Sequence, residues 1–326
     1  MTPLDLVGRA DAVRELISAW DRVPRETTHG GPQTVVITGE AGVGKSRLIS
    51  AAVDAIRERD ASVTVLSASA RVHSPAPYDW LAGILSQAPR HDLPVPPEAL
   101  AWLAQDPDVP RLRYAPDALL RIAVRTVREL VGAGPAVIVV DDLHALDPAS
   151  VNLVAELAAA PGLPALLLVA GRPAADAAAP ELIRLVLARL VGGAHARRVH
   201  VGPLSESEVG ELLRGRDPQC PAATAAAAHR ITAGNPYRLN ELIATTDLAA
   251  LAAPVADPTA ADLTARELEV LACLASGMSN KQVARSLGIS IRTVGVHVSS
   301  LLRKTRSASR TDAALWAVRS RVLADR

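Results

Sequence analysis

Short, continuous apolar runs recur along the first two thirds of the chain, separated by longer stretches with helical periodicity. Apolar runs of this length without alternation are typical of strands buried on both faces of a parallel sheet. The stretches between them are long enough to be the helices that connect parallel strands. The sequence therefore predicts a doubly wound α/β domain with strands at residues 34–38, 62–66, 136–140, 165–170 and 198–201.

Several helices are predicted around these strands. An amphipathic pattern near the N-terminus places Val13, Leu16, Ile17 and Trp20 on one face. Two helical stretches, at residues 205–214 and 222–232, come after the last strand, and we expect them to form a helical lid. The remaining expected helices cover residues 45–59, 78–85 and 117–131.

Helix starts are marked clearly near the end of the chain. The tetrapeptides at 264–267 and 279–282 both begin with Thr or Ser and end with Glu or Gln, which is the capping-box pattern. Ser290 predicts the start of a third helix, and Gly288 the end of the second. Two helices joined by a three-residue turn predict a helix-turn-helix.

The region between these two parts has the composition of a linker. Residues 248–262 hold seven Ala, two Pro and no basic residue. With a length of 326 residues, about two domains are expected. We expect an α/β domain over residues 1–247, a linker over 248–262 and a small all-α domain over 263–326.

Composition and charge narrow the class of protein. No apolar run approaches the ~18 residues of a membrane span, and the first residues lack the features of a signal peptide, so we expect a cytoplasmic protein without membrane contact. Cys220 and Cys273 are too few and too far apart for a metal motif or a disulfide framework. The net charge is +1, yet residues 263–326 hold 11 Lys/Arg and 4 Asp/Glu. This basic end predicts binding to a polyanion.

Residues 39–46 match the pattern G-x-x-x-x-G-K-[ST] at every fixed position and lie between a predicted strand and a predicted helix. Such a loop cradles phosphate groups with its backbone N–H groups, and the following helix adds its positive N-terminal dipole. We expect Lys45 to contact the β- and γ-phosphates and Ser46 to bind Mg²⁺. A glycine turn that binds nothing is the alternative. The predicted nucleotide-contacting residues of the loop are Gly39, Gly42, Val43, Gly44, Lys45, Ser46 and Arg47.

Acidic residues follow the predicted strand at 136–140, at the sheet edge where ligands bind in such folds. Asp141 is predicted to hold Mg²⁺, and Asp142 to orient or activate the attacking water. Arg172 follows another strand and either senses the γ-phosphate or is a solvated loop residue. Val7, Gly8 and Arg9 either lie near the adenine or belong to a packing segment.

The third C-terminal helix has a buried face with Val294, Val298 and Leu301. We expect its other face to contact DNA, with Thr293, His297 and Lys304 on phosphates and Val296 and Ser299 facing the bases. A bundle with a merely solvated basic face is the alternative. The predicted DNA-binding residues are Arg292, Thr293, Val296, His297, Ser299, Ser300, Arg303 and Lys304.

The residues at 263–271, 277–284 and 290–298 resemble the LuxR-type DNA-binding domain. Upstream, the segments at 6–9, 39–47, 141–148, 171–173 and 234–236 resemble the ATPase domain of large LuxR-type regulators related to the maltose activator. That domain belongs to the signal-transducing (STAND) branch of AAA-like P-loop ATPases. The resemblance implies an adenine-side role for Arg9 and Pro236 and a γ-phosphate sensor role for Arg172.

The chain departs from that family pattern in three places. It lacks the winged-helix and helical-repeat segments between the two domains, Ala145 stands where Trp is common, and Gly295 stands where a basic residue is common. We expect a transcription regulator in which ATP binding or slow hydrolysis controls self-association and DNA binding. The expected partners are double-stranded DNA, RNA polymerase and further copies of the chain. The alternative is an ATP-driven motor or remodelling enzyme that the C-terminal domain targets to DNA.

Overall fold

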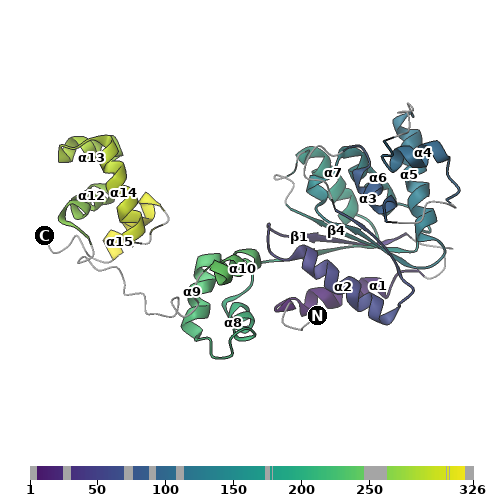
Figure 1. Ribbon diagram of the computed structural model, residues 1–326, viewed down its shortest axis with the longest axis horizontal. Helices are drawn as coiled ribbons and strands as arrows, with labels where there is room; N and C mark the ends of the chain where they lie inside the picture. The colour runs from purple at the N-terminus through teal and green to yellow at the C-terminus, as the bar shows by residue number, and fades with distance from the viewer. Residues whose placement is uncertain are drawn as a thin grey trace. The chain divides into compact units, whose positions relative to one another are not determined.

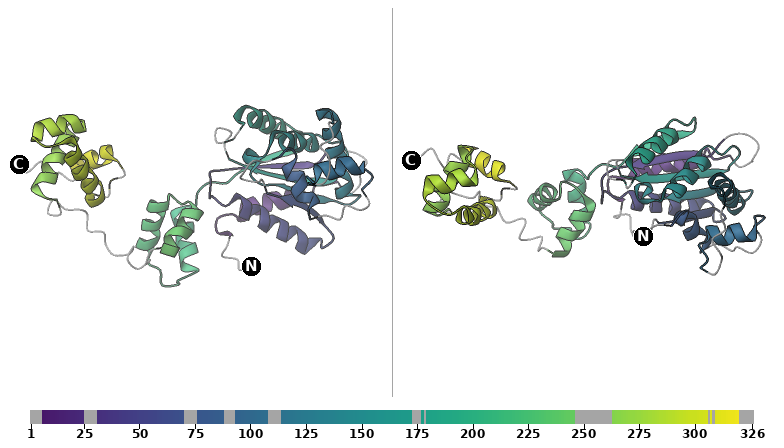
Figure 2. Two further views of the ribbon diagram at one scale, coloured as in Figure 1. Left: turned by 45° about the horizontal axis from the view of Figure 1, so that its top comes forward. Right: turned by 90° about the horizontal axis from the view of Figure 1, so that it is seen from above.

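The computed structural model describes residues 6–24, 31–69, 76–87, 93–107, 114–172, 177, 179–245, 263–305, 307 and 309–319. The chain divides into two compact units, residues 1–251 and 252–326, and each is described by itself. Figures 1 and 2 show their elements from three directions. The predicted linker at 248–262 lies outside the described residues.

The first unit is built on a five-stranded parallel sheet with the strand order β2-β3-β4-β1-β5. All five predicted strands are present among the described residues, with ends shifted by no more than two residues. Their bounds are β1 (Gln33–Thr38), β2 (Thr64–Ala68), β3 (Ala136–Val140), β4 (Ala165–Gly171) and β5 (Ala196–His200). The prediction of a parallel α/β fold is confirmed.

Helices cover both faces of this sheet (Figure 1). Alternate residues of a strand point to opposite faces. Val35 and Ile37 of β1 accordingly pack with α1 (Ala10–Trp20) and α2 (Lys45–Arg59). Val36 packs in the larger core on the other face. The helices of that face are α3 (Asp79–Leu85), α4 (Pro97–Leu103), α5 (Pro116–Val131), α6 (Pro148–Ala158) and α7 (Pro180–Val191).

Three helices follow β5 and share a small apolar core of their own. They are α8 (Glu206–Arg214), α9 (Ala222–Thr232) and α10 (Pro236–Thr245), and we call them the lid. Val209, Leu213 and Leu239 are among the fully buried residues of that core. The first two helices agree with the predicted ranges, whereas α10 was not predicted.

The second unit is a small helical bundle. The expected helix starts are correct, because the side chains of Thr264 and Ser279 both form complete capping boxes. Gly288 ends α13 in the left-handed conformation, with φ 65°. Val270, Val283 and Leu301 lie in the common core. The helices are α12 (Ala265–Ala275), α13 (Asn280–Leu287), α14 (Ile291–Thr305) and α15 (Arg310–Arg319), of which α13 and α14 form the predicted helix-turn-helix.

Candidate functional site

The loop between β1 and α2 takes a backbone shape that requires glycine at two positions. Gly42 and Gly44 have φ angles of 77° and 98°, in the left-handed region that glycine adopts without steric cost. A Cβ at Gly44 would meet no atom within 4 Å, so its conformation alone requires glycine. The helix α2 starts at Lys45, and its N-terminus adds positive charge to the end of the loop.

Lys45 folds back onto this loop. Its Nζ donates to the carbonyl oxygens of residues 39 and 40 at 2.9 and 2.8 Å, and only 6% of the residue is exposed. Burial lowers the pKa of Lys45. The charges of Asp142 and Asp141 raise that pKa, and the charge of Arg172 lowers it. The structure therefore brings the three predicted catalytic and metal-binding side chains into electrostatic range of the Lys45 ammonium.

The two carboxylates follow β3 at the carboxyl edge of the sheet. Asp142 has φ 56°, a left-handed conformation that Asp tolerates better than most residues. Its N–H donates to Oδ1 of Asp141 at 3.0 Å, and its Oδ1 lies 3.8 Å from Nδ1 of His144. Arg172 follows β4, which pairs with β3, so it comes to the same edge. Pro173 lies outside the described residues.

The donor set at this edge fits a magnesium ion that is shared with phosphates. Ser46 is exposed at the start of α2, and Asp141 is half-buried. Among the described residues, no group of three or more His, Cys, Asp or Glu side chains could hold a metal alone. Mg²⁺ usually keeps several waters and takes one or two protein carboxylates plus substrate phosphates. One hydroxyl and one carboxylate from the protein are thus enough ligands when waters and phosphates supply the others.

A cavity of about 420 Å³ lies at the other edge of the sheet. Its lining includes Thr34, His195 and Ala196, at the amino ends of β1 and β5. Open parallel sheets bind ligands beyond the carboxyl ends of their strands. We therefore assign the candidate site to the loop and the two carboxylates rather than to this cavity.

Arg9 connects the N-terminal segment to the same loop. Its Nη2 donates to the carbonyl oxygens of Gly202 at 2.6 Å and Val43 at 3.3 Å. Burial lowers the pKa of Arg9, and the nearby Glu208 carboxylate raises it. The N-terminal segment, in which Val7 is buried, thus lies beside the loop and the start of the lid. Its contact with adenine stays a prediction.

Asn235 contacts the loop from the lid, and the sequence did not predict this contact. Its Nδ2 donates to the carbonyl oxygen of Ala41 at 2.8 Å, across a separation of 194 residues. The N–H of Tyr237 donates to the carbonyl oxygen of Gly42 at 3.2 Å. Asn followed by Pro236 signals a helix start, but such a local signal does not name a distant partner. The adenine contact predicted for Pro236 remains untested.

In the second unit, the outer face of α14 is mostly polar, with Val296 as an exposed apolar residue. Val296 is 64% exposed, whereas Val294 and Leu301 are fully buried on the opposite side. His297 is half-buried. The predicted DNA-binding residues that are exposed are Arg292, Thr293, Val296, Ser299 and Arg303.

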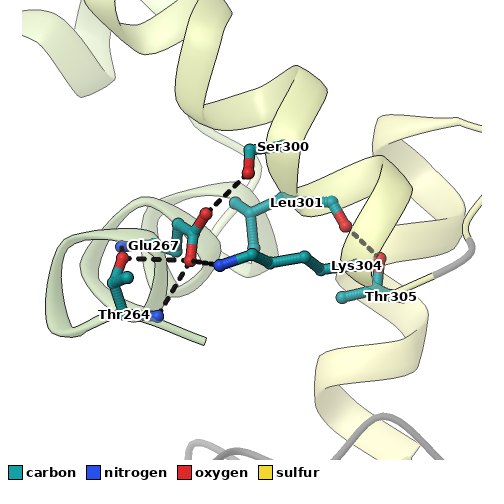
Figure 3. A network of polar contacts seen from close by, with 6 residues as sticks. All are labelled: Thr264, Glu267, Ser300, Leu301, Lys304 and Thr305. Carbon is teal, nitrogen blue, oxygen red and sulfur yellow. Dashed lines mark hydrogen bonds and ion pairs between the residues drawn. The ribbon is translucent and has the colours of Figure 1, made fainter. Parts of the chain in front are cut away.

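Ser300 and Lys304 turn instead toward Glu267 on α12 (Figure 3). The Glu267 carboxylate accepts bonds from Ser300 Oγ and Lys304 Nζ, both at 2.7 Å, and from the N–H of Thr264 at 2.8 Å. Burial raises the pKa of Glu267, which is 4% exposed, but the hydrogen bonds from these three residues outweigh burial and lower its pKa to about 2. Ser300 and Lys304 thus hold α14 against α12, and their predicted DNA contacts remain untested.

Comparison with known proteins agrees with this division of the chain. Residues 5–169 match the family of the AAA ATPase domain, and residues 261–317 match the luxR family of bacterial regulatory proteins. Among the described residues, no helix has the length and apolar character that a membrane span needs.

Curated relatives resemble the C-terminal part. The uncharacterized transcriptional regulatory protein YhcZ of Bacillus subtilis is 54% identical over 57 residues, which cover 18% of this chain and 27% of YhcZ. The nitrate/nitrite response regulator protein NarL of Escherichia coli K12 is 43% identical over 60 residues, covering 18% of this chain and 28% of NarL. The chain therefore spans little more than a quarter of the length of these relatives.

A solved structure supports the fold. CDC6P from Pyrobaculum aerophilum has a TM-score of 0.52 and 14% identity, covering 92% of this chain and 86% of that protein, and this likeness concerns the fold alone. The AAA match extends over more than half of the 326 residues. The chain therefore belongs to the AAA ATPase domain family, and it carries a C-terminal helix-turn-helix domain of the luxR family of bacterial regulatory proteins.

Proposed function

We propose that this chain is an ATP-binding, sequence-specific DNA-binding regulator of transcription, in which ATP binding or slow hydrolysis controls self-association and DNA binding. One observation carries the nucleotide half: the buried Lys45 ammonium lies on a glycine loop within range of Asp141, Asp142 and Arg172. The luxR-family match and the exposed, mostly polar face of α14 support the DNA half. RNA polymerase is the further partner that such regulation implies.

The residues at the sheet edge can divide the work on a nucleotide. Ser46 and Asp141 would hold Mg²⁺, which would supply positive charge to neutralise the phosphates. Lys45 would exchange its two loop carbonyls for phosphate oxygens. Asp142 would orient the attacking water and accept its proton, while Arg172 would contact the γ-phosphate.

Asp142→Asn should leave Mg·ATP binding within about threefold of the parent but slow hydrolysis by about 10²- to 10⁴-fold, the usual contribution of a general base. The amide keeps the shape of the side chain and cannot accept the water's proton. Calorimetric titration and single-turnover hydrolysis measure the two effects. Asp21→Asn is the control, because Asp21 lies at the C-terminal end of α1 and its side chain is exposed. Hydrolysis by Asp142→Asn at the parent rate would contradict the role of Asp142.

Two neighbouring basic residues on α14 are expected to have different roles, one as a DNA contact and the other as a contact within the fold. Arg303 is exposed, so Arg303→Ala should weaken binding to all duplexes and reduce the slope of log affinity against log salt by about one unit. Lys304 is bonded to Glu267, so Lys304→Ala should leave that slope nearly unchanged and lower the thermal stability of the unit. Filter-binding or anisotropy titrations at several salt concentrations measure the slopes. An equal loss of slope in Lys304→Ala would restore Lys304 as a phosphate contact.

Self-association is the simplest route from nucleotide to DNA in this proposal. Joining two DNA-binding units raises the effective concentration of the second and adds about 10²- to 10⁴-fold in avidity. Such a gain would offset the DNA contact that is missing because Gly295 stands where a basic residue is common. A non-hydrolysable ATP analogue should therefore promote dimers and tighten binding to paired half-sites, with little effect on a single half-site.

Analytical ultracentrifugation with and without the analogue, together with titrations of one-site and two-site DNA, tests this function. A monomer under every condition, or equal tightening on both DNAs, would rule out the mechanism. ATP hydrolysis that rises strongly with added DNA would instead favour the alternative, a motor or remodelling enzyme targeted to DNA.

A further inference from the structure

We propose that Asn235 is a positioning residue of the phosphate loop: from the lid, it fixes the orientation of the peptide groups that meet the phosphates. The proposal rests on the nucleotide site proposed above. It assigns to Asn235 a role at the loop, distinct from the adenine-side role that the resemblance implies for its neighbour Pro236.

The polar atoms of the Asn235 side chain are all engaged within the protein. Its Nδ2 donates to the carbonyl oxygen of Ala41 at 2.8 Å. Its Oδ1 accepts the N–H groups of Tyr237 at 3.0 Å and Arg238 at 3.3 Å, which makes it the N-cap of α10. Only 8% of the residue is exposed. Asn235 thus couples the first turn of a lid helix to one peptide group of the loop.

The loop carbonyls next to Ala41 are held in the same way. The Gly42 carbonyl accepts the N–H of Tyr237 at 3.2 Å, and the Val43 carbonyl accepts Nη2 of Arg9 at 3.3 Å. In a trans peptide the C=O and the following N–H point in opposite directions. Three successive N–H groups, at residues 42, 43 and 44, therefore point away from the lid and from Arg9. Convergent N–H groups of this kind are what a phosphate-binding loop offers its ligand.

The close approach of the lid to the loop depends on two glycines. A Cβ on Gly42 would lie 2.7 Å from Tyr237 Cβ and 2.8 Å from Asn235 Oδ1. Gly234 has φ 71°, and a Cβ there would lie 2.0 Å from the carbonyl oxygen of Leu204. The backbone of Gly234 also accepts the N–H of Leu204 at 2.8 Å. The turn that presents Asn235 is thus fixed at the entry of the lid as well as at the loop.

Because the lid holds the peptide groups of the loop, the arrangement of the lid and the affinity for phosphate are coupled. With the Asn235 contact in place, the N–H groups are oriented before the nucleotide arrives, which reduces the entropy lost on binding. Without that contact, the loop must order itself on binding. Loss of the Nδ2 donor to Ala41 should therefore weaken ATP binding.

Asn235→Ser tests this in the full-length chain. Serine caps a helix as well as asparagine does, so α10 keeps its N-cap, while the shorter hydroxyl no longer reaches Ala41. We expect the Kd for Mg·ATP by calorimetry to rise about three- to tenfold, the range of one hydrogen bond. Amide hydrogen exchange at residues 42–44 under saturating ATP should be faster than in the parent, with exchange in α9 and α10 unchanged. That pattern separates positioning from a general loss of lid structure.

Asn240→Ser is the matched control, because Asn240 lies on the same helix and bonds to Arg216 within the lid. It should bind ATP as the parent does. Asn235→Asp is a second variant that keeps the capping oxygen: its carboxylate cannot donate to Ala41, whereas its protonated form can. At neutral pH it should therefore also bind ATP more weakly than the parent. Asn235→Ser binding within twofold of the parent, or an equal loss in Asn240→Ser, would overturn the inference alone. Failure of the parent to bind ATP would overturn the proposed nucleotide site with it.

Discussion

Lys45→Met should raise the Kd for Mg·ATP by about ten- to a hundredfold. The methionine keeps the aliphatic stem but removes the ammonium that lies 2.8–2.9 Å from two loop carbonyls and that would meet the β- and γ-phosphates. Hydrogen bonds to charged groups contribute about 1.5–3 kcal/mol, and each 1.4 kcal/mol is a factor of ten in Kd. Isothermal titration of the full chain measures the change.

The comparison requires a variant that loses a lysine elsewhere. Lys281 is exposed on α13 in the other unit, so Lys281→Met should bind ATP like the parent. The two variants have the same net charge, which removes long-range electrostatics as an explanation. Unchanged affinity in Lys45→Met, with a parent-like melting curve, would show that the loop does not bind nucleotide phosphates in the proposed way.

Glu267→Gln should destabilise the C-terminal unit by about 3 kcal/mol at neutral pH. The folded-state pKa of Glu267 is about 2, against an ordinary value of 4.5, and each unit of difference corresponds to about 1.4 kcal/mol. The glutamine keeps the size of the side chain, but Lys304 and Ser300 lose their charged acceptor. Amide hydrogen exchange in α12 and α14 of the full chain reports the opening free energy of this unit alone.

The effect has a definite pH dependence. Because folding lowers the pKa of Glu267, the stability it contributes is fully present above about pH 4.5 and is lost as the pH falls toward 2. The parent and Glu267→Gln should therefore converge in acid. Glu269→Gln is the control: Glu269 pairs with Arg266 on the same helix at a more exposed site, so its loss should cost less than about 1 kcal/mol. Equal effects of the two changes would refute the role of Glu267.

Two helices that were not predicted, α6 and α7, nevertheless carry local start signals. Helices α6 and α7 both begin with a proline at the first helical position, and Asp147 caps α6 by accepting the N–H of Ser150 at 2.9 Å. Asp147 also accepts the N–H groups of Tyr78 and Asp79, which no local pattern announces. The start signals of α6 and α7 were thus present in the sequence, whereas the packing that Asp147 organises depends on a segment about 70 residues away.

The features that could be predicted from the sequence are those that short-range chemistry encodes. The glycine loop at 39–46, the buried runs of β1, β3 and β4, and the capping boxes at Thr264 and Ser279 each depend on residues within a few positions of one another. Backbone sterics, side-chain hydrophobicity and hydrogen bonds between neighbouring residues are properties that the local sequence carries.

Which side chains become partners depends on the folding of the whole chain. Asn235 bonds to Ala41 across 194 residues, and Lys304 bonds to Glu267 across 37 residues rather than standing free on the outer face of α14. Arg303 and Lys304 are neighbouring basic residues on the same helix, and the local sequence does not show which of them pairs with a carboxylate. The difference arises because folding places a buried carboxylate within 2.7 Å of one such residue, Lys304, and leaves another, Arg303, exposed to solvent.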